Sequence, residues 1–214
     1  MRMIARTPAY STCADIPAEH LPSHPGFVAL AAIAGIDIDL RYAGAANFAG
    51  RVLYRGFDCA FLRREAADAL RQAVRWLAQQ APGHRLRVLD AVRPQRVQEA
   101  IWADVAGTPD AMYFADPAAG SIHSYGMAVD LTIVGPDGAE LDMGAGFDEL
   151  HPRSHPALEA RFLEEGVLNL EHIAHRELLR GAMRAGGFDG ISTEWWHFDL
   201  GDRARIRREG PRVV

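Results

Sequence analysis

The sequence predicts an α+β fold: a single domain, residues 1–214, with a central antiparallel or mixed sheet flanked by helices. Its length suits one large domain. Helical and strand-like patterns are mixed along the chain rather than strictly alternating, which disfavours a doubly wound parallel sheet. The turn signal Pro136-Asp137-Gly138 follows a strand-like segment, which is typical of a hairpin.

In the first half of the chain, each element follows from its local pattern. Residues 1–26 are rich in Pro, Ser and His, so we expect this segment to wrap the surface. Apolar and acidic residues alternate over 36–40, which is typical of a half-buried strand. Apolar residues recur at helical spacing over 63–81, and Pro82-Gly83 ends this helix. A short apolar segment, 87–92, predicts a buried strand.

The second half begins with a helix at Pro94, whose one apolar face is formed by Val97, Ile101 and Val105. Further elements are read in the same way: a strand at 128–134, its return at 139–143, helices at 156–165 and 171–185, and a last strand at 196–200. Gly186-Gly187 ends the second of these helices.

The composition is that of an ordinary globular protein, with 49% hydrophobic and 24% charged residues. A net charge of −5 argues against a nucleic-acid binder, which normally has a basic face. The run from Arg203 to Arg208 is interrupted at both ends by Asp202 and Glu209, so we read it as a solvated tail.

No stretch approaches the 18 apolar residues of a membrane span, and no signal peptide is recognised, so we expect a cytoplasmic protein without a membrane partner. The two cysteines, Cys13 and Cys59, form no metal-binding or disulfide pattern. A single bridge between them stays open, although Cys59 suits a small core position better. The oligomeric state is not readable.

Two fragments together suggest a catalytic zinc site. They are Ser121-Ile122-His123-Ser124-Tyr125-Gly126-Met127-Ala128-Val129-Asp130 and Glu194-Trp195-Trp196-His197. Two imidazoles and one carboxylate give three ligands and leave a fourth position open, as in catalytic rather than structural zinc sites. The remaining carboxylate, Glu194, is suited to act as a general base.

The spacings in both fragments require bends. His123 and Asp130 are seven apart, and Glu194 and His197 are three apart, so in straight strands each pair would point to opposite faces. We therefore expect the chain to bend at Gly126 and again at Trp195, with the Trp side chains, Trp196 included, holding the second bend by packing. Each fragment alone has a plain alternative: a chance His and Asp, or an aromatic core strand. Their co-occurrence is what favours a metal.

With these residues the chain resembles the D-alanyl-D-alanine dipeptidases, the VanX-like zinc metallopeptidases of the wider Hedgehog/D,D-peptidase fold. The family patterns S-x-H-x-x-G-x-A-x-D and E-x-W-H are both complete. Arg93 matches the family arginine, although Val92 stands where Tyr is usual, which leaves the pocket near Arg93 open to question. Further matches extend the resemblance over about 36–200: Tyr42-Ala43, Asn47-Phe48, Asp142-Met143-Gly144, Phe147-Asp148 and Arg153-Ser154-His155.

The resemblance implies one zinc ion bound by His123, Asp130 and His197, with Glu194 as the general base and Arg93 stabilising the oxyanion. It also implies hydrolysis of the dipeptide D-Ala-D-Ala to two D-alanines. Zinc lowers the pKa of water to about 7, which makes such a base effective at neutral pH.

A dipeptidase must also recognise both free ends of its substrate. Asp148 and the Tyr42 hydroxyl are the candidates for the α-ammonium group, and Ser121 is the candidate for the α-carboxylate. The plain alternatives are a turn residue, a half-buried ring and a loop-fixing hydroxyl. Asp90 is expected to orient Arg93 rather than to react; a strand-end acid without that role is the alternative.

Two other functions compete with the dipeptidase. One is a zinc D,D-carboxypeptidase or endopeptidase acting on longer peptidoglycan stem peptides. The other is a binding module that keeps zinc without catalysis, which the retention of Glu194 and Arg93 disfavours. Neither the preferred dipeptide nor the biological role, antibiotic resistance or D-alanine recycling, can be read from the sequence.

Overall fold

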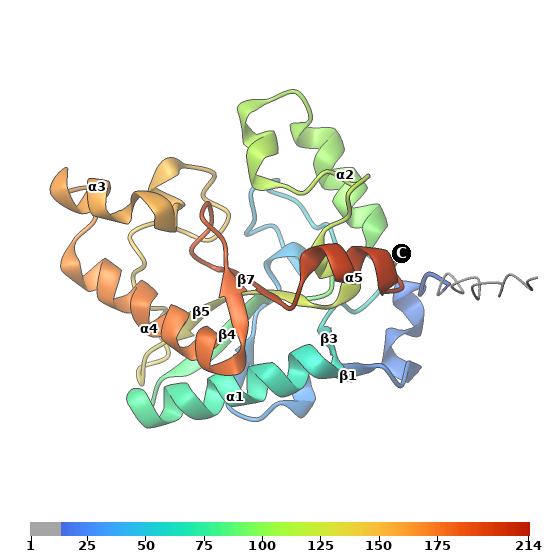
Figure 1. Ribbon diagram of the computed structural model, residues 1–214, viewed down its shortest axis with the longest axis horizontal. Helices are drawn as coiled ribbons and strands as arrows, with labels where there is room; N and C mark the ends of the chain where they lie inside the picture. Colours follow the sequence, from blue (N-terminus) through green and yellow to red (C-terminus); the bar gives the residue numbers. More distant parts are fainter. Residues whose placement is uncertain (1–13) are drawn as a thin grey trace, which may run out of the picture.

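A computed structural model describes residues 14–214; Cys13, and with it any bridge to Cys59, lies outside the described residues. The core is a five-stranded sheet in the order β2-β4-β5-β7-β6 (Figure 1). Its strands are β2 (Ile36–Ile38), β4 (Arg85–Asp90), β5 (Ala128–Val134), β7 (His197–Leu200) and β6 (Phe188–Gly190). β2 and β4 are parallel and the other neighbours antiparallel, which confirms the predicted α+β class with a mixed sheet.

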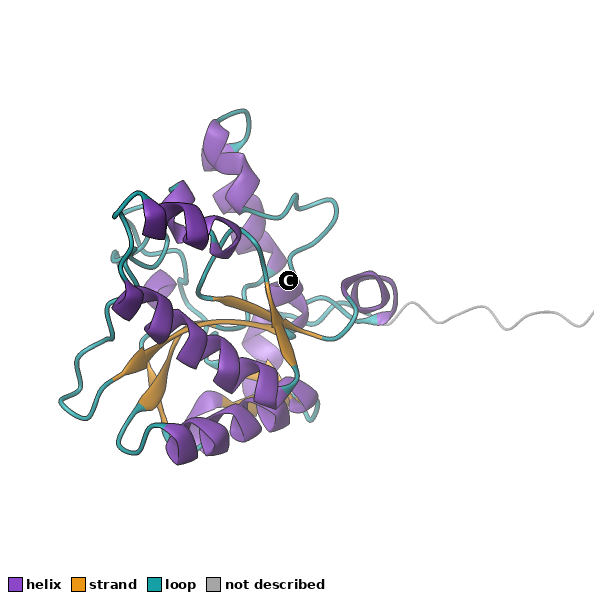
Figure 2. Cartoon of the chain, turned by 60° about the vertical axis from the view of Figure 1, so that its left-hand side comes forward, coloured by secondary structure: helices purple, strands orange, loops and turns teal. Residues whose placement is uncertain are grey.

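Two long helices, α1 (Arg64–Gln80) and α4 (Leu170–Gly186), lie side by side against one face of this sheet (Figure 2). The remaining α-helices are α2 (Gln95–Val105), α3 (Glu159–Glu164) and α5 (Arg203–Glu209), and a separate two-stranded sheet pairs β1 (Phe27–Ala29) with β3 (Phe61–Arg63). Short 3-10 helices occupy the connections: η1 (Ala18–Ser23), η2 (Leu30–Ala32), η3 (Arg41–Ala43), η4 (Pro109–Tyr113), η5 (Ile122–Tyr125), η6 (Pro152–Ser154) and η7 (Pro156–Leu158).

The central strand β5 separates the core from the polar face of the sheet. All seven of its residues are buried, so both of its faces are covered. Val129, Leu131 and Ile133 belong to the core cluster that includes the buried sides of α1 and α4. Because side chains alternate along a strand, Asp130 and Thr132 point to the opposite face. A charged residue inside this strand is therefore directed away from the hydrophobic core.

A bulge in β4 turns Asp90 to the same polar face. Val88 pairs with Leu131, but Asp90 pairs with Asp130, so two steps along β4 correspond to one step along β5. Val88 belongs to the core cluster, and regular alternation would have directed Asp90 toward the core as well. The extra residue in the bulge shifts the alternation of side chains by one, so Asp90 points to the polar face instead. Asp90, Asp130 and its other cross-strand neighbour, His197, consequently form a row across three adjacent strands.

Gly126 provides the sharp turn between η5 and β5. Its φ is +67°, in the left-handed region, and a Cβ atom there would lie 2.7 Å from Phe27 Cε1 and 3.1 Å from the backbone N of Arg63. Only glycine meets both the conformational and the steric requirement without strain. The bend expected at Gly126 is thus confirmed.

The predicted return strand at 139–143 is wrong. Only an isolated bridge, between Val134 and Glu140, forms there. β5 is flanked by β4 along 130–134 and by β7 along 128–130, so its free edge is restricted to its last residues. The other predicted elements exist with shifted ends. β4 begins two residues before the predicted strand, β7 begins at His197, and the first turn of the 156–165 helix is the 3-10 helix η7.

The reading of the Arg203–Arg208 run as a solvated tail is also wrong. These residues form α5, which Asp202 caps by accepting a hydrogen bond from the backbone N of Arg205. Ile206 is buried and packs against Ile122, Tyr125 and Ala128, so the helix is anchored to η5 and β5. The interruption by Asp202 is a helix start signal rather than a break in a tail.

Within the described part of the N-terminal segment, Ile16 pairs with Val213, and Ile16, Ala18 and Leu21 are buried. They form a cluster with Val92, which therefore faces away from the polar side of the sheet. Cys59 is buried, in agreement with a core position. No helix among residues 14–214 is long and apolar enough to cross a membrane.

Replacing Gly126 by Ala is expected to destabilise the protein by about 2–4 kcal/mol, the sum of a left-handed backbone penalty and overpacking. The urea midpoint of the metal-free protein measures this loss. Gly138→Ala is the matched control, because Gly138 also has positive φ (+83°) but nothing lies within 4 Å of the added Cβ. Equal losses in the two variants would contradict the steric part of the argument.

Candidate active site

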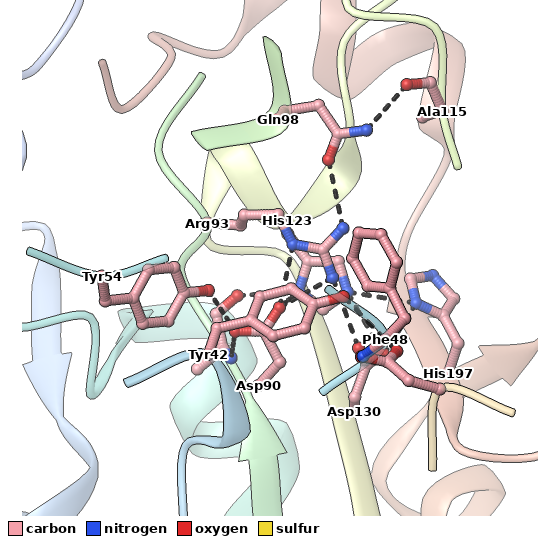
Figure 3. Close-up of polar contacts among 12 residues, drawn as sticks. Tyr42, Phe48, Tyr54, Asp90, Arg93, Gln98, Ala115, His123, Asp130 and His197 are labelled. Carbon is pink, nitrogen blue, oxygen red and sulfur yellow. Dashed lines mark hydrogen bonds and ion pairs between the residues drawn. The ribbon is translucent and has the colours of Figure 1, made fainter. Parts of the chain in front are cut away.

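Three side chains from η5, β5 and β7 converge on one point (Figure 3). His123 Nε2 lies 3.1 Å from His197 Nδ1 and 3.2 Å from Asp130 Oδ1, and the latter two atoms are 2.9 Å apart. His123 and Asp130 are buried, and His197 is largely buried. The three residues predicted as metal ligands are therefore brought together at this point.

The hydrogen bonds behind the two imidazoles fix which nitrogens carry protons. His123 Nδ1 donates to the Ala91 carbonyl oxygen over 2.7 Å, since a carbonyl can only accept. His197 Nε2 donates to Asp199 Oδ1 over 2.9 Å. In the neutral rings, His123 Nε2 and His197 Nδ1 thus present lone pairs toward Asp130 Oδ1 and toward each other.

Three acceptor atoms so close together repel one another unless a cation lies between them. With zinc–nitrogen and zinc–oxygen bonds of about 2.0–2.1 Å, tetrahedral ligands are about 3.3 Å apart, close to the separations found here. The donor set of two imidazoles and one carboxylate is also one that zinc prefers. The residues present therefore fit a zinc ion.

The electrostatics of the cluster likewise favour a positive charge. Burial raises the pKa of Asp130, but His123 and His197 lower it to well below the usual range. Burial lowers the pKa of His197, but Asp199 and Asp130 raise it well above the ordinary value. The surroundings therefore stabilise a cation beside Asp130, and a metal ion would replace the proton in that role.

Behind His197 lies a second carboxylate, Asp199, which the sequence reading did not single out. Asp199 is buried, accepts the Nε2 proton of His197 and is paired with Arg203 of α5. This arrangement fixes the orientation of the ring and makes the opposite nitrogen a better electron-pair donor. Its position two residues after His197 on a strand places it on the same face, a signal that was present in the sequence.

Glu194 lines the same cavity as the cluster, and its side chain is buried. No hydrogen bond or ion pair to its carboxyl group is found among residues 14–214, so the group is free to take and give a proton. Burial raises its pKa to about 8, assisted by Asp130 and Asp148 and opposed by His197 and Arg93. The chain bends at Trp195 and Trp196, which confirms the second predicted bend and turns both Glu194 and His197 toward the cavity.

Arg93 is buried and held from two sides. Its Nε and Nη2 donate to Asp90 Oδ2 over 3.0 and 2.8 Å, and its Nη1 donates to Gln98 Oε1 over 3.1 Å. Asp90 also accepts a hydrogen bond from the Tyr54 hydroxyl, and Gln98 donates to the Ala115 carbonyl oxygen (Figure 3). The guanidinium group is thereby fixed with Nη2 at 3.5 Å from Asp130 Oδ2, at the edge of the cluster.

Tyr42 and Asp148 form another polar pair in the cavity wall. The Tyr42 hydroxyl donates to Asp148 Oδ1 over 3.3 Å. The Arg93 guanidinium lies over the Tyr42 ring, with 4.9 Å between Arg93 Cζ and the ring centroid. Asp148 has φ +57° and accepts a hydrogen bond from the backbone N of Phe48. Burial raises the pKa of Asp148 to about 7, opposed by Arg93. A non-glycine residue in the left-handed region is strained, which is common at ligand sites.

The cavity that these groups share has a volume of about 330 Å³. Ser121, at the start of η5, contributes to its wall and is buried, and no hydrogen bond to its hydroxyl is found in the described part of the chain. Trp196 forms part of the wall with its ring packed edge-on against Phe147, 5.5 Å between centroids, and against Trp195, 5.4 Å. Every residue that the sequence singled out for the site, apart from the supporting Asp90, therefore lines this one cavity.

Comparison with known proteins gives the site its context. A family model described as D-ala-D-ala dipeptidase, Peptidase_M15, matches residues 24–212. The chain belongs to this peptidase family. It is 41% identical to the D-alanyl-D-alanine dipeptidase of Escherichia coli (strain K12) over 165 residues, which cover 77% of this chain and 79% of the relative. It is 30% identical to that of Enterococcus faecium, with 78% and 87% covered.

The chain is accordingly a peptidase. Among solved structures, that of the LdcB LD-carboxypeptidase is a more distant match, with a TM-score of 0.45 and 16% identity over 89% of this chain and 80% of that one.

Several groups of this peptidase site were missed by the sequence reading. Tyr54 and Gln98, which hold Asp90 and Arg93, come from a loop and from α2, and neither stands in a motif. Arg203 and Arg207 line the cavity although the reading placed them in solvent. Val92, where the family usually has Tyr, packs in the cluster around Ile16 and does not line the cavity, so its effect on the pocket is indirect.

Replacing Asp199 by Asn is expected to weaken zinc binding about tenfold to a hundredfold, because the His197 ring loses its charged hydrogen-bond partner. Competition with a chromogenic chelator measures the affinity directly, without reference to turnover. Asp189→Asn makes the same chemical change on the neighbouring strand, at an exposed position opposite Asp199, and should leave the affinity unchanged. Similar affinities for all three proteins would refute the role given to Asp199.

Proposed function

We propose that this chain is a zinc-dependent dipeptidase that hydrolyses D-Ala-D-Ala to two D-alanines. The observation that carries the proposal is the convergence of three potential ligand atoms in the cavity that also holds a buried carboxyl group, Glu194, without a hydrogen bond or ion pair among residues 14–214. Membership of the family and the names of both relatives support the same substrate. The cavity volume of about 330 Å³ lies at the small end of the range for ligand sites, about 300–1,000 Å³, and suits a small substrate.

His123, Asp130 and His197 would hold the zinc ion. When bound, the zinc supplies Lewis acidity, which lowers the pKa of water to about 7 and polarises a carbonyl group. Glu194 is the proton carrier: its carboxylate takes a proton from the attacking water and later gives it to the leaving amine. The pKa of Glu194, which burial raises to about 8, would be lowered toward neutrality by a cation held by the three ligands, and a carboxyl group with such a pKa can perform both transfers.

Arg93 is proposed to stabilise the negative charge that develops on the carbonyl oxygen. Its Nη1 has a second N–H with no partner among residues 14–214, and a guanidinium fixed by Asp90 and Gln98 needs no reorganisation during the reaction. The loss of one such donor typically costs about 3–4 kcal/mol of transition-state stabilisation.

The two charged ends of the substrate are assigned to different residues of the cavity. Asp148, with the Tyr42 hydroxyl beside it, is proposed to bind the α-ammonium group, and Ser121 the α-carboxylate. A site that pairs both free ends rejects longer peptides, because a buried charged group left without its partner is costly. The cytoplasm stays the expected compartment, and no nucleic-acid or membrane partner is proposed.

The function is tested by hydrolysis of D-Ala-D-Ala, L-Ala-L-Ala and an N-acylated tripeptide ending in D-Ala-D-Ala by the zinc-loaded protein, with released alanine of either configuration measured. We expect D-Ala-D-Ala to be cleaved at least about a hundredfold faster than either alternative, since each lost polar contact costs about 1–3 kcal/mol. Efficient cleavage of the tripeptide without action on the free dipeptide would instead indicate a carboxypeptidase of longer stem peptides.

Glu194→Gln is expected to reduce kcat by about a thousandfold or more, because it keeps the shape of the side chain and removes its base. Zinc content, measured by elemental analysis, should stay at about one ion per chain, since Glu194 is not a proposed ligand. Unchanged turnover would exclude Glu194 as the base, and loss of zinc would show that its role lies in metal binding.

A pH dependence of KM is expected from Asp148. Its pKa of about 7 means that the carboxylate loses its charge as the pH falls, so the α-ammonium group is bound less well and KM rises from pH 8 to pH 6. The positive charge of a bound ion would move this rise in KM to lower pH, but KM would still increase as the pH falls. Asp148→Asn should raise KM at pH 8 and make KM independent of pH between pH 8 and pH 6. If KM of the variant still rises over this range, another group is responsible for the pH dependence.

A further inference from the structure

The helix α5 contributes two of its arginines to the active-site cavity. Arg203 and Arg207 line it, whereas Arg205 and Arg208 do not. The spacing of four residues places Arg203 and Arg207 on one face of the helix. Ile206, buried against Ile122, holds that face against η5, which carries His123.

The two arginines differ in whether a carboxylate group compensates the charge of the guanidinium. Arg203 is paired with Asp199, so its charge is already compensated. Arg207 donates only its Nε proton, over 2.9 Å, to the carbonyl oxygen of Gly120. No hydrogen bond or ion pair to its two Nη groups is found among residues 14–214. Arg207 is half-buried and thus offers an uncompensated guanidinium fork to the cavity.

This fork is anchored directly beside Ser121. Gly120, which accepts from Arg207, is the preceding residue, and the Ser121 hydroxyl also lines the cavity without a partner in the described residues. A hydroxyl and a guanidinium fork together make a strong carboxylate site, because the two Nη donors match the two oxygens. The acidic groups of the cavity come from other elements: Asp130 and Asp199 from β5 and β7, and Asp148 and Glu194 from loops.

The position of α5 also fits the direction of a bound dipeptide. Figure 1 shows α5 and α3 on opposite sides of β7, and Asp148 lies in the connection that leads to α3. Arg207 on α5 and Asp148 in this connection therefore contribute to the cavity from different elements. A dipeptide whose ammonium group is bound at Asp148 would present its carboxylate to another element of the cavity wall, as α5 is.

We propose that Arg207 is a specificity-determining residue that binds the α-carboxylate of the substrate together with Ser121. This inference rests on the proposed dipeptidase function and extends it. A neutral C-terminal amide has the same size but no charge, so it gains nothing from the guanidinium. The preference of the enzyme for a free acid over the amide is therefore the property that Arg207 controls.

The experiment compares zinc-loaded wild type, Arg207→Gln and Arg205→Gln on D-Ala-D-Ala and on D-Ala-D-Ala amide. Arg205 is the matched control, because it lies on the same helix and is exposed, and its backbone N donates to Asp202 Oδ1 while no hydrogen bond or ion pair of its guanidinium is found among residues 14–214. For Arg207→Gln we expect KM for the acid to rise about tenfold to a hundredfold, the loss of a charged hydrogen bond, with kcat within about threefold. KM for the amide should stay unchanged, and Arg205→Gln should match wild type throughout.

A loss that is equal for acid and amide would overturn the proposal, because it would assign to Arg207 only the fixing of the Gly120 loop. Equal behaviour of Arg207→Gln and Arg205→Gln would overturn it as well. Thermal unfolding of the variants separates a folding defect from a binding defect, and Arg207→Lys, which keeps the charge without the fork, should recover part of the acid preference. If wild type cleaves no D,D-dipeptide and calorimetry detects no binding of D-Ala-D-Ala, both this inference and the proposed function fail; cleavage without the Arg207 effect rejects the inference alone.

Discussion

The convergence of His123 Nε2, Asp130 Oδ1 and His197 Nδ1 within 3.2 Å of one another is the constraint on which the rest of the site depends. Lone pairs this close are unfavourable without a cation, so the surrounding structure has to hold them in place. It does so with the carbonyl of Ala91 behind one ring and Asp199 behind the other. Two further groups lie next to the cluster: Glu194, whose pKa is raised chiefly by burial and further by Asp130, and Arg93, whose Nη2 lies 3.5 Å from Asp130 Oδ2.

The division of the sheet into two faces makes this concentration of charge tolerable. Hydrophobic side chains of β5 pack with α1 and α4 on one face, while Asp130 and His197 line the cavity and Asp90 lies beside Asp130 on the polar face. The free energy that holds the sheet together is therefore supplied on the side that carries no chemistry. The polar side can hold buried ionisable groups, all of those in the row across the strands paired or hydrogen-bonded, without weakening the core.

The sequence was sufficient for the class of fold, for the convergence of His123, Asp130 and His197 and for the two bends, because these depend on local patterns and on motifs with fixed spacing. It failed where tertiary contacts decide. The 139–143 segment has the turn chemistry of a hairpin, but β7 already pairs with 128–130 of β5, so pairing with this segment is restricted to the end of β5 and to one bridge. The arginines of α5 look solvated in isolation, and only the packing of Ile206 turns two of them inward. The roles of Tyr54 and Gln98 could not be predicted, because neither stands in a motif and their contacts with Asp90 and Arg93 are formed only in the folded chain.

The bulge in β4 has a consequence for how this protein can vary. Up to Val88 the even-numbered side chains of β4 point to the core face of the sheet, and after the bulge Asp90 points to the polar face. A single residue inserted or deleted between these positions would exchange the two, sending the partner of Arg93 into the hydrophobic interior and a core side chain into the cavity. β4 can therefore change its composition over generations more readily than its length. The position of the bulge therefore decides which residues of β4 face the active site.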